Sequence, residues 1–198
     1  MRNNETGRSM VEMLGVLAII GVLSAGGLAG YSKAMFKHKL NSTMEQITMF
    51  VTNIRTSYGT QRNYANLSMA NAYSLGIVPA AISTNGTTFT NPFKGAVDIA
   101  PVAVKSAEGS AATAGFTLKY TKLPKEACIA LATADFGSGA GSGFVGVDVY
   151  ASTDKSTPST VFVGSGSTDT TRKEGAAYTM ANAINACSEQ ATIIWKFY

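Results

Sequence analysis

The stretch that decides the fold is residues 7–30, GRSMVEMLGVLAIIGVLSAGGLAG. From Met13 to Gly30 it carries no charge, and about 18 apolar residues are enough for a helix that crosses a membrane. A secretory signal peptide has a shorter apolar core, which a cleavage site and a new domain follow. Here the helical pattern continues past the apolar stretch. This predicts a helix that lies in lipid, or among copies of itself, at one end.

The pattern after residue 30 indicates that the same helix continues with a single apolar face. Apolar residues recur every three or four positions, as they do on one side of an amphipathic helix. They are Phe36, Leu40, Met44, Ile47, Val51, Ile54 and Tyr58. Gly59 follows as a C-terminal cap. We therefore expect one helix over residues 8–58, about 75 Å long at a rise of 1.5 Å per residue.

Three glycines, Gly26, Gly27 and Gly30, lie inside this predicted helix. Each costs about 1 kcal/mol of helix stability relative to alanine. Two interpretations stay open. Small residues allow membrane helices to pack closely, and a run of glycines also allows a helix to bend or unwind during assembly.

Residues 59–198 are predicted to form a globular α+β domain. Alternating side chains and turn residues place strands at 97–104 and 115–120, after a short helix at 66–75 and a turn-rich stretch at 83–95. The remaining predictions are a helix at 124–133 that begins near Pro124, a flexible loop at 137–143, a strand at 144–149, a long surface loop at 151–171, a helix at 176–189 and a closing strand at 191–198.

Composition and charge exclude some partners. The chain has 198 residues, of which 14% are charged, below the usual quarter. Its formal net charge is +4, and the densest basic cluster is Lys33, Lys37, His38 and Lys39, just after the apolar stretch. Nucleic-acid binding needs a concentrated basic stripe, so no nucleic-acid partner is expected.

Cys128 and Cys187 are the two cysteines of the chain. An even number of cysteines, in a chain whose N-terminal part is typical of export, favours one disulfide. Two unrelated buried thiols are the alternative. A bridge would close a loop of about 60 residues, which the chain-entropy model values at about 4 kcal/mol.

The sequence contains no motif for catalysis. His38 is the single histidine and lies among lysines, and the sequence has no P-loop, nucleophile elbow or metal-ligand spacing. The stretch 137–143, GSGAGSG, has no lysine and follows no clear strand, so it is interpreted as a flexible loop and not as a phosphate site. We therefore expect no enzyme, no catalytic residue, no metal and no cofactor.

Glu12 is the site-like residue of the apolar stretch. A carboxylate at lipid depth costs a few kcal/mol, although a glutamate in the first turn of a helix is favoured by the helix dipole. Its spacing from Gly7 favours a function. If the chain is cut after Gly7, Arg8 becomes the first residue and Glu12 the fifth. The new α-amino group of a neighbouring subunit would then be available to pair with Glu12.

Glycine, a glutamate five residues on and an uninterrupted apolar core together resemble the N-terminal region of type IV pilins. The resemblance implies cleavage by a leader peptidase between Gly7 and Arg8, N-methylation of Arg8, and a role for Glu12 in filament assembly. Two positions differ from the family pattern: Arg8 stands where a hydrophobic residue is usual, and Ala29 stands where many members have proline.

The rest of the chain resembles type IVb pilins and the related conjugative-pilus, PilS-type pilins. The segments that show this resemblance are FTLKYTKLPKEAC at 116–128 and NPFKG at 91–95. The resemblance implies a disulfide between Cys128 and Cys187 that closes the C-terminal region. It also implies an α+β fold with a long N-terminal helix packed on a mostly antiparallel sheet, and three parts: a leader at 1–7, the long helix at 8–58 and a globular domain at 59–198.

The function that this resemblance implies is structural. We expect a subunit that rests in the bacterial inner membrane as a single-pass precursor and then polymerises through its apolar helix into an extracellular pilus. Its expected partners are copies of itself, the prepilin peptidase and the pilus assembly machinery. Two alternatives stay open: a minor pilin or type II secretion pseudopilin, and an anchored binding domain that does not polymerise.

Overall fold

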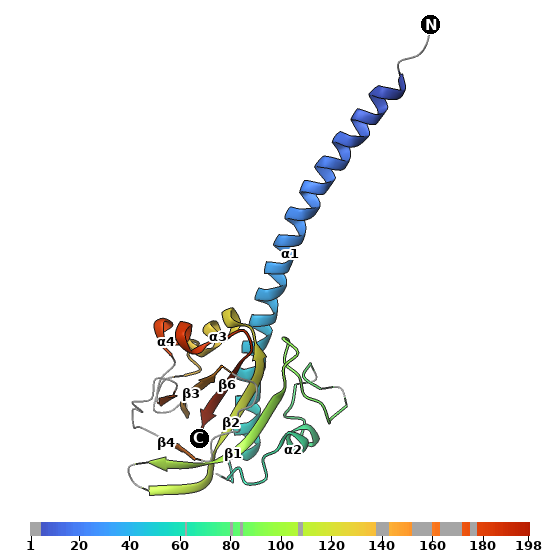
Figure 1. Ribbon diagram of the computed structural model, residues 1–198. Coiled ribbons are helices and arrows are strands. Elements are labelled where there is room, and N and C mark those ends of the chain that lie inside the picture. Colours follow the sequence, from blue (N-terminus) through green and yellow to red (C-terminus); the bar gives the residue numbers. More distant parts are fainter. Residues whose placement is uncertain are drawn as a thin grey trace. The chain divides into compact units, whose positions relative to one another are not determined.

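The structure is a computed structural model, and it describes residues 5–61, 63–79, 81–83, 85–106, 109–137, 143–151, 160–162, 172–174 and 178–198. It contains two compact units, Met1–Asn41 and Ser42–Tyr198. The first unit consists of helix, and the second contains a sheet, three short helices and the end of the long helix (Figure 1). Each unit is described below by itself.

The predicted long helix is present as α1, Glu5–Tyr58. It begins three residues earlier than residue 8 and ends at the predicted residue. A side chain on Gly59 would place its Cβ 2.5 Å from the carbonyl oxygen of Arg55, which explains why glycine follows the last turn. Within the second unit, the buried face of α1 is carried by Ile47, Phe50 and Ile54, each fully buried.

The amphipathic face predicted for this part of α1 is confirmed at three positions, and two others are only partly buried. Ile47, Ile54 and Tyr58 are buried, as their spacing predicted. Met44 and Val51 are half-buried, and Phe50, one position before Val51, is fully buried in the core. A large ring beside a smaller β-branched side chain removes more apolar surface from water.

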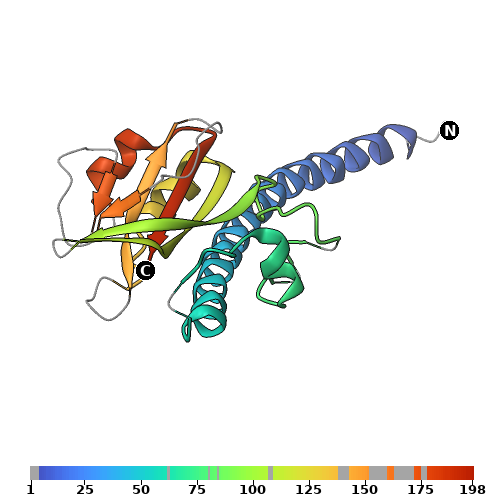
Figure 2. The same ribbon diagram turned by 90° about the horizontal axis from the view of Figure 1, so that it is seen from below.

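The sheet has six strands in the order β4-β1-β2-β6-β3-β5. Four of them, β1 (Val97–Ser106), β2 (Gly109–Leu123), β6 (Ala191–Phe197) and β3 (Phe144–Tyr150), pair antiparallel in that order. Figure 2 shows β6, in dark red, in the interior of the sheet. The last strand of the sequence therefore joins two parts of the sheet that are far apart along the chain.

Two short strands form the edges. β4 (Thr160–Phe162) pairs parallel with β1, and β5 (Arg172–Glu174) pairs antiparallel with β3. The prediction of a continuous surface loop over 151–171 is therefore wrong at β4. Three residues are too few to give a detectable alternation in sequence. Residues 152–159 and 163–171, and residues 138–142 of the predicted glycine-rich loop, lie outside the described residues.

The three short helices are α2 (Met69–Ser74), α3 (Lys125–Ala132) and α4 (Met180–Ala186). The helix predicted at 124–133 corresponds closely to α3, which follows Pro124. Helices α2 and α4 begin after residues whose side chains cap their first turns: Ser68 accepts from the backbone N–H of Asn71, and Thr179 accepts from that of Asn182. Residues 176 and 177 of the predicted helix at 176–189 lie outside the described residues, and α4 ends before 189 because Cys187 has extended backbone. An N-cap residue has extended backbone, so the helix begins after it.

Aromatic rings connect the end of α1 with the sheet. The ring centroids of Tyr58 and Tyr64 lie 5.8 Å apart, and those of Tyr64 and Phe116 5.0 Å apart. Phe116 stacks on Phe197 at 5.2 Å, which carries the contact from β2 to β6. The expected α+β fold, a long N-terminal helix with a mostly antiparallel sheet, is confirmed.

Candidate functional site

The part of α1 from Met10 to Gly30, here called the apolar segment, exposes its hydrophobic side chains on all sides. Their exposed fractions run from 52% for Ile20 to 75% for Val22. Among the described residues α1 is the one helix that is long and apolar enough to cross a membrane, by length and composition. A contiguous apolar surface of this extent marks a site that binds a membrane or another protein.

The glycines of the apolar segment leave notches in its surface. A Cβ added at Gly15, Gly21, Gly26, Gly27 or Gly30 would meet nothing within 4 Å. The fold of the unit itself therefore does not require glycine at these positions. Small residues at a helix surface allow a second helix to approach closely, so the notches suit contacts with another helix.

The predicted cleavage and assembly residues all lie on α1. The structure describes the backbone of Gly7 and Arg8 as part of its first turns, and Glu12 follows on the same helix. Five residues of helix separate Gly7 from Glu12 by about 7.5 Å along the axis. This places Glu12 near the N-terminal end of the apolar segment, where it is the eighth residue of α1.

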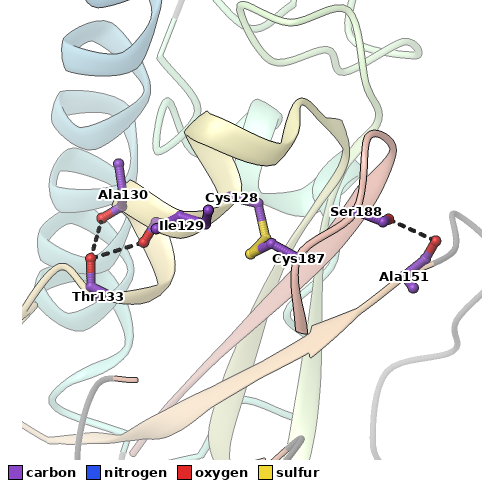
Figure 3. The surroundings of a disulfide bond; sticks show 7 residues. All are labelled: Cys128, Ile129, Ala130, Thr133, Ala151, Cys187 and Ser188. Atoms are coloured by element: carbon purple, nitrogen blue, oxygen red, sulfur yellow. Dashed lines mark hydrogen bonds between the residues drawn. A yellow bond between two sulfur atoms is a disulfide. The ribbon is translucent and has the colours of Figure 1, made fainter. Parts of the chain in front are cut away.

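The two cysteines form a disulfide, as predicted. Cys128 in α3 and Cys187 directly after α4 have Cα atoms 5.8 Å apart and are separated by 59 positions in sequence (Figure 3). Both are buried. Near the bridge, the Ser188 hydroxyl donates to the carbonyl oxygen of Ala151 at 3.0 Å. The disulfide joins the two ends of the 128–187 region, and the hydrogen bond ties the chain after Cys187 to the residue that follows β3.

The NPFKG segment fastens the loop before β1 to the sheet. The Asn91 side chain accepts from the backbone of Phe93 at 2.9 Å and of Gly95 at 3.0 Å, and donates to the carbonyl of Thr121 at 2.9 Å. A Cβ on Gly95 would overlap that same carbonyl. Asparagine and glycine are thus both required by the turn and its approach to β2.

A buried ion pair lies in the sheet, and sequence reasoning missed it. Lys196 Nζ on β6 lies 2.9 Å from a carboxylate oxygen of Asp148 on β3, with side-chain exposures of 2% and 0%. The Tyr150 hydroxyl lies 3.4 Å from the other carboxylate oxygen of Asp148. One signal was available: two opposite charges occur inside strands whose other residues are mostly apolar, and buried charges need partners.

Arg55 is a second residue that the sequence did not reveal. Its guanidinium lies over the Phe197 ring, 5.7 Å from the centroid, and donates to the carbonyl oxygen of Tyr198 at 3.3 Å. Burial lowers the pKa of Arg55, and burial raises the pKa of Tyr64 beside it. Gly143 leaves room for this contact, because a Cβ there would overlap the guanidinium.

The described residues contain no group of three or more histidine, cysteine, aspartate or glutamate side chains that could hold a metal ion. His38 lies exposed on α1. The described features serve folding or offer a surface for contact. They are an exposed apolar helix, a region closed by a disulfide, and a loop that Asn91 hydrogen-bonds to the sheet.

Comparison with known proteins gives relatives of one kind. Two curated relatives, each named as the major structural subunit of bundle-forming pilus, come from Escherichia coli O127:H6 (strain E2348/69 / EPEC) and Escherichia coli O111:H-. Each is 28% identical over 137 residues, which cover 69% of this chain and 68% of the relative. These relatives are structural proteins, in agreement with the expectation that the chain is not an enzyme.

Solved structures extend the comparison to the fold. TcpA, a type IV pilin from Vibrio cholerae El Tor biotype, matches 81% of this chain and 99% of its own with a TM-score of 0.53 at 17% identity. A type IV b pilin from Salmonella typhi matches 76% of this chain and 96% of its own with a TM-score of 0.47 at 16% identity. The similarity to TcpA shows the type IV pilin fold.

A family model agrees with this fold. The model described as PilS N terminal matches residues 37–197, which comprise the later part of α1 and nearly all of the second unit. The match begins after the apolar segment, so the exposure of that segment is an observation that does not depend on the family match. The chain belongs to the PilS N terminal family.

Proposed function

We propose that this chain is a structural subunit of a type IV pilus of the type IVb kind, and that it polymerises through its apolar segment into an extracellular filament. The observation that carries the proposal is the exposure of the apolar segment, at 52% or more for its large hydrophobic side chains, in a chain with a type IV pilin fold. The names of the curated relatives support the same role.

The free energy of assembly comes mainly from apolar burial. Complete burial of a Val, Leu, Ile or Met side chain contributes about 1.5–3 kcal/mol. Many such side chains of the apolar segment are more than half exposed in the single subunit, so assembly can still bury them. A pairing between Glu12 and an α-amino group adds little net free energy, because both charges lose their hydration. Glu12 is therefore better suited to set the register between subunits.

The steps before assembly follow from the same proposal. The precursor spans the inner membrane through the apolar segment, and a prepilin peptidase cuts between Gly7 and Arg8 and methylates the new N terminus. The pilus assembly machinery then extracts the subunit. N-terminal mass spectrometry of the mature protein tests this order: a chain that begins with methylated Arg8 supports it, and an intact Met1 contradicts it.

Glu12→Ala tests the proposed assembly. The variant should remain in the membrane fraction, because it makes the segment more apolar, while filaments sheared from the cell surface fall about tenfold or more through loss of register. Glu189→Ala, which removes an exposed glutamate from the second unit, is the matched control and should leave filaments unchanged. Normal filaments from Glu12→Ala would contradict the role of Glu12 in setting register.

A further inference from the structure

The turns of α1 directly after the apolar segment combine an aromatic ring with positive charge. Tyr31 keeps 64% of its surface exposed, and Lys33 and Lys37 are exposed as well. Among the described residues, neither of these lysines forms an ion pair. The sequence from 13 to 44 contains no aspartate or glutamate, so the helix itself supplies no anion nearby. We call Lys33 and Lys37 the lysine pair.

The two lysines of the pair lie on one side of the helix. Residues four positions apart are neighbours on an α-helix, and like charges at that spacing lower the stability of the helix. No acidic residue stands three or four positions from either lysine to offset the repulsion. An anion bound between the two ammonium groups would remove this repulsion, and it has to come from another molecule.

The lysine pair lies at the depth of lipid head groups when the apolar segment spans a membrane. Residues 10–30 are about 31 Å long in helix, which matches a hydrocarbon core of about 30 Å. Tyr31 then falls at the boundary of the hydrocarbon, where aromatic rings concentrate. Lys33 lies about 5 Å beyond residue 30 along the axis and Lys37 about 10 Å, and the head groups occupy about 5–7 Å.

The geometry of the helix brings Lys37 back to the same layer. Side chains of an α-helix lean toward its N terminus, which here is the direction of the apolar segment. A lysine can lay its apolar stem along the hydrocarbon boundary and keep its ammonium group among the polar groups. The Ser32 hydroxyl donates to the carbonyl oxygen of Leu28 at 3.0 Å, so this donor is already paired at the boundary.

We propose that the lysine pair binds the phosphate group of an anionic phospholipid, in the leaflet that surrounds the Tyr31 end of the apolar segment. The inference rests on the proposed function, because it requires a precursor that spans a membrane. Hydrogen bonds from ammonium groups to a phosphate are charge-assisted and therefore strong. A zwitterionic lipid carries its own cation beside the phosphate, so an anionic lipid such as phosphatidylglycerol gains more from two lysines.

The other end of the apolar segment has a different charge balance. There Arg2 and Arg8 are accompanied by Glu5 and Glu12, so their charges cancel in the sum. The preference for anionic lipid is therefore expected at the Tyr31 end. A lipid held there fixes the depth of the precursor in the membrane, and extraction of the subunit has to break both lysine contacts.

Electron spin resonance of the full chain in phosphatidylcholine bilayers tests this proposal. A trace of spin-labelled phosphatidylglycerol or phosphatidylcholine reports how strongly the protein immobilises each lipid. The parent chain should prefer phosphatidylglycerol. Lys33→Gln combined with Lys37→Gln should lower the association constant of phosphatidylglycerol by about fivefold or more, because each lysine near an anionic lipid contributes about that factor, and leave that of phosphatidylcholine unchanged.

Two matched variants serve as controls. Lys33→Arg combined with Lys37→Arg keeps both charges and should keep the preference. Lys122→Gln combined with Lys125→Gln removes two exposed lysines from the second unit and should also keep it. Glutamine is about as good a helix former as lysine, so circular dichroism should show the same helix content in every variant.

The outcomes separate this inference from the proposed function. Equal immobilisation of the two lipids by the parent chain, or a preference that survives in Lys33→Gln with Lys37→Gln, would overturn the lysine pair as a lipid site. Loss of the preference in Lys122→Gln with Lys125→Gln would also overturn it, because the effect would then follow net charge. A parent chain that immobilises neither lipid would contradict the membrane-spanning precursor of the proposed function instead.

Discussion

The apolar segment and the second unit use hydrophobic side chains in opposite ways. In the segment, Leu17 keeps 63% of its surface exposed, whereas Leu118 in β2 is fully buried. The second unit closes its own core with rings, a disulfide and an ion pair, and the segment leaves its apolar surface for other molecules. If the apolar segment carries assembly as proposed, folding and assembly use separate parts of one chain, and substitutions should affect them separately.

The largest effect on folding is expected at the buried ion pair. Lys196→Ala leaves Asp148 charged, buried and without its cation, which should lower the free energy of unfolding by about 3–5 kcal/mol. Denaturant unfolding of the detergent-solubilised chain measures this. Replacing both residues together, as Lys196→Met with Asp148→Leu, should recover most of the loss, because no charge then remains buried. A loss in the double variant as large as in the single one would contradict the explanation.

A matched pair of leucine substitutions tests the comparison itself. Leu118→Ala removes a fully buried side chain and should cost about 2–5 kcal/mol of unfolding free energy. Leu17→Ala removes an exposed one and should change it by less than about 0.5 kcal/mol, while it reduces the amount of sheared filament. If Leu17→Ala lowered the unfolding temperature as much as Leu118→Ala, the separation of folding from assembly would be wrong.

The smallest predicted effect is a gain in stability. The Tyr120 hydroxyl is buried and has no hydrogen-bond partner among the described residues, at a cost of about 1–3 kcal/mol. Tyr120→Phe keeps the ring against Trp195, at a centroid distance of 5.6 Å in the parent. We expect the unfolding free energy at neutral pH to rise by about 1 kcal/mol. A drop of that size would show that the hydroxyl has a stabilising partner.

The same variant should change the response to alkaline pH. Burial raises the pKa of Tyr120 above its ordinary value of 10.0, so above that pH the unfolded chain releases this proton and the folded chain keeps it. The contribution of Tyr120 to the free energy of unfolding is fully present below about pH 10. It falls as the pH rises, by at most about 1.4 kcal/mol per pH unit for one group. Tyr120→Phe removes this contribution, and unfolding curves at pH 9 to about 11 should show a shallower decline than in the parent. Equal declines would contradict the assignment to Tyr120.

Features that depend on local spacing could be predicted from the sequence. The length of α1 followed from its periodicity, the helix after Pro124 from the proline, and the turn at Asn91 from its residues. The pairing of Cys128 with Cys187 came from the resemblance and from the number of cysteines. These predictions needed no knowledge of which strands become neighbours.

Features that depend on long-range pairing could not be predicted from the sequence. Asp148 and Lys196 meet because β6 inserts next to β3, and their separation along the chain gives no indication of it. The contact of Arg55 with Phe197 and Tyr198 likewise requires the closing strand to lie beside α1.

Electron cryo-microscopy of filaments sheared from cells that produce the full chain tests the central claim most directly. We predict a helical filament in which residues 10–30 are buried among copies of themselves. Filaments in which the side chains of the apolar segment face solvent, or a surface fraction in which the chain is present only as single anchored subunits, would contradict the account.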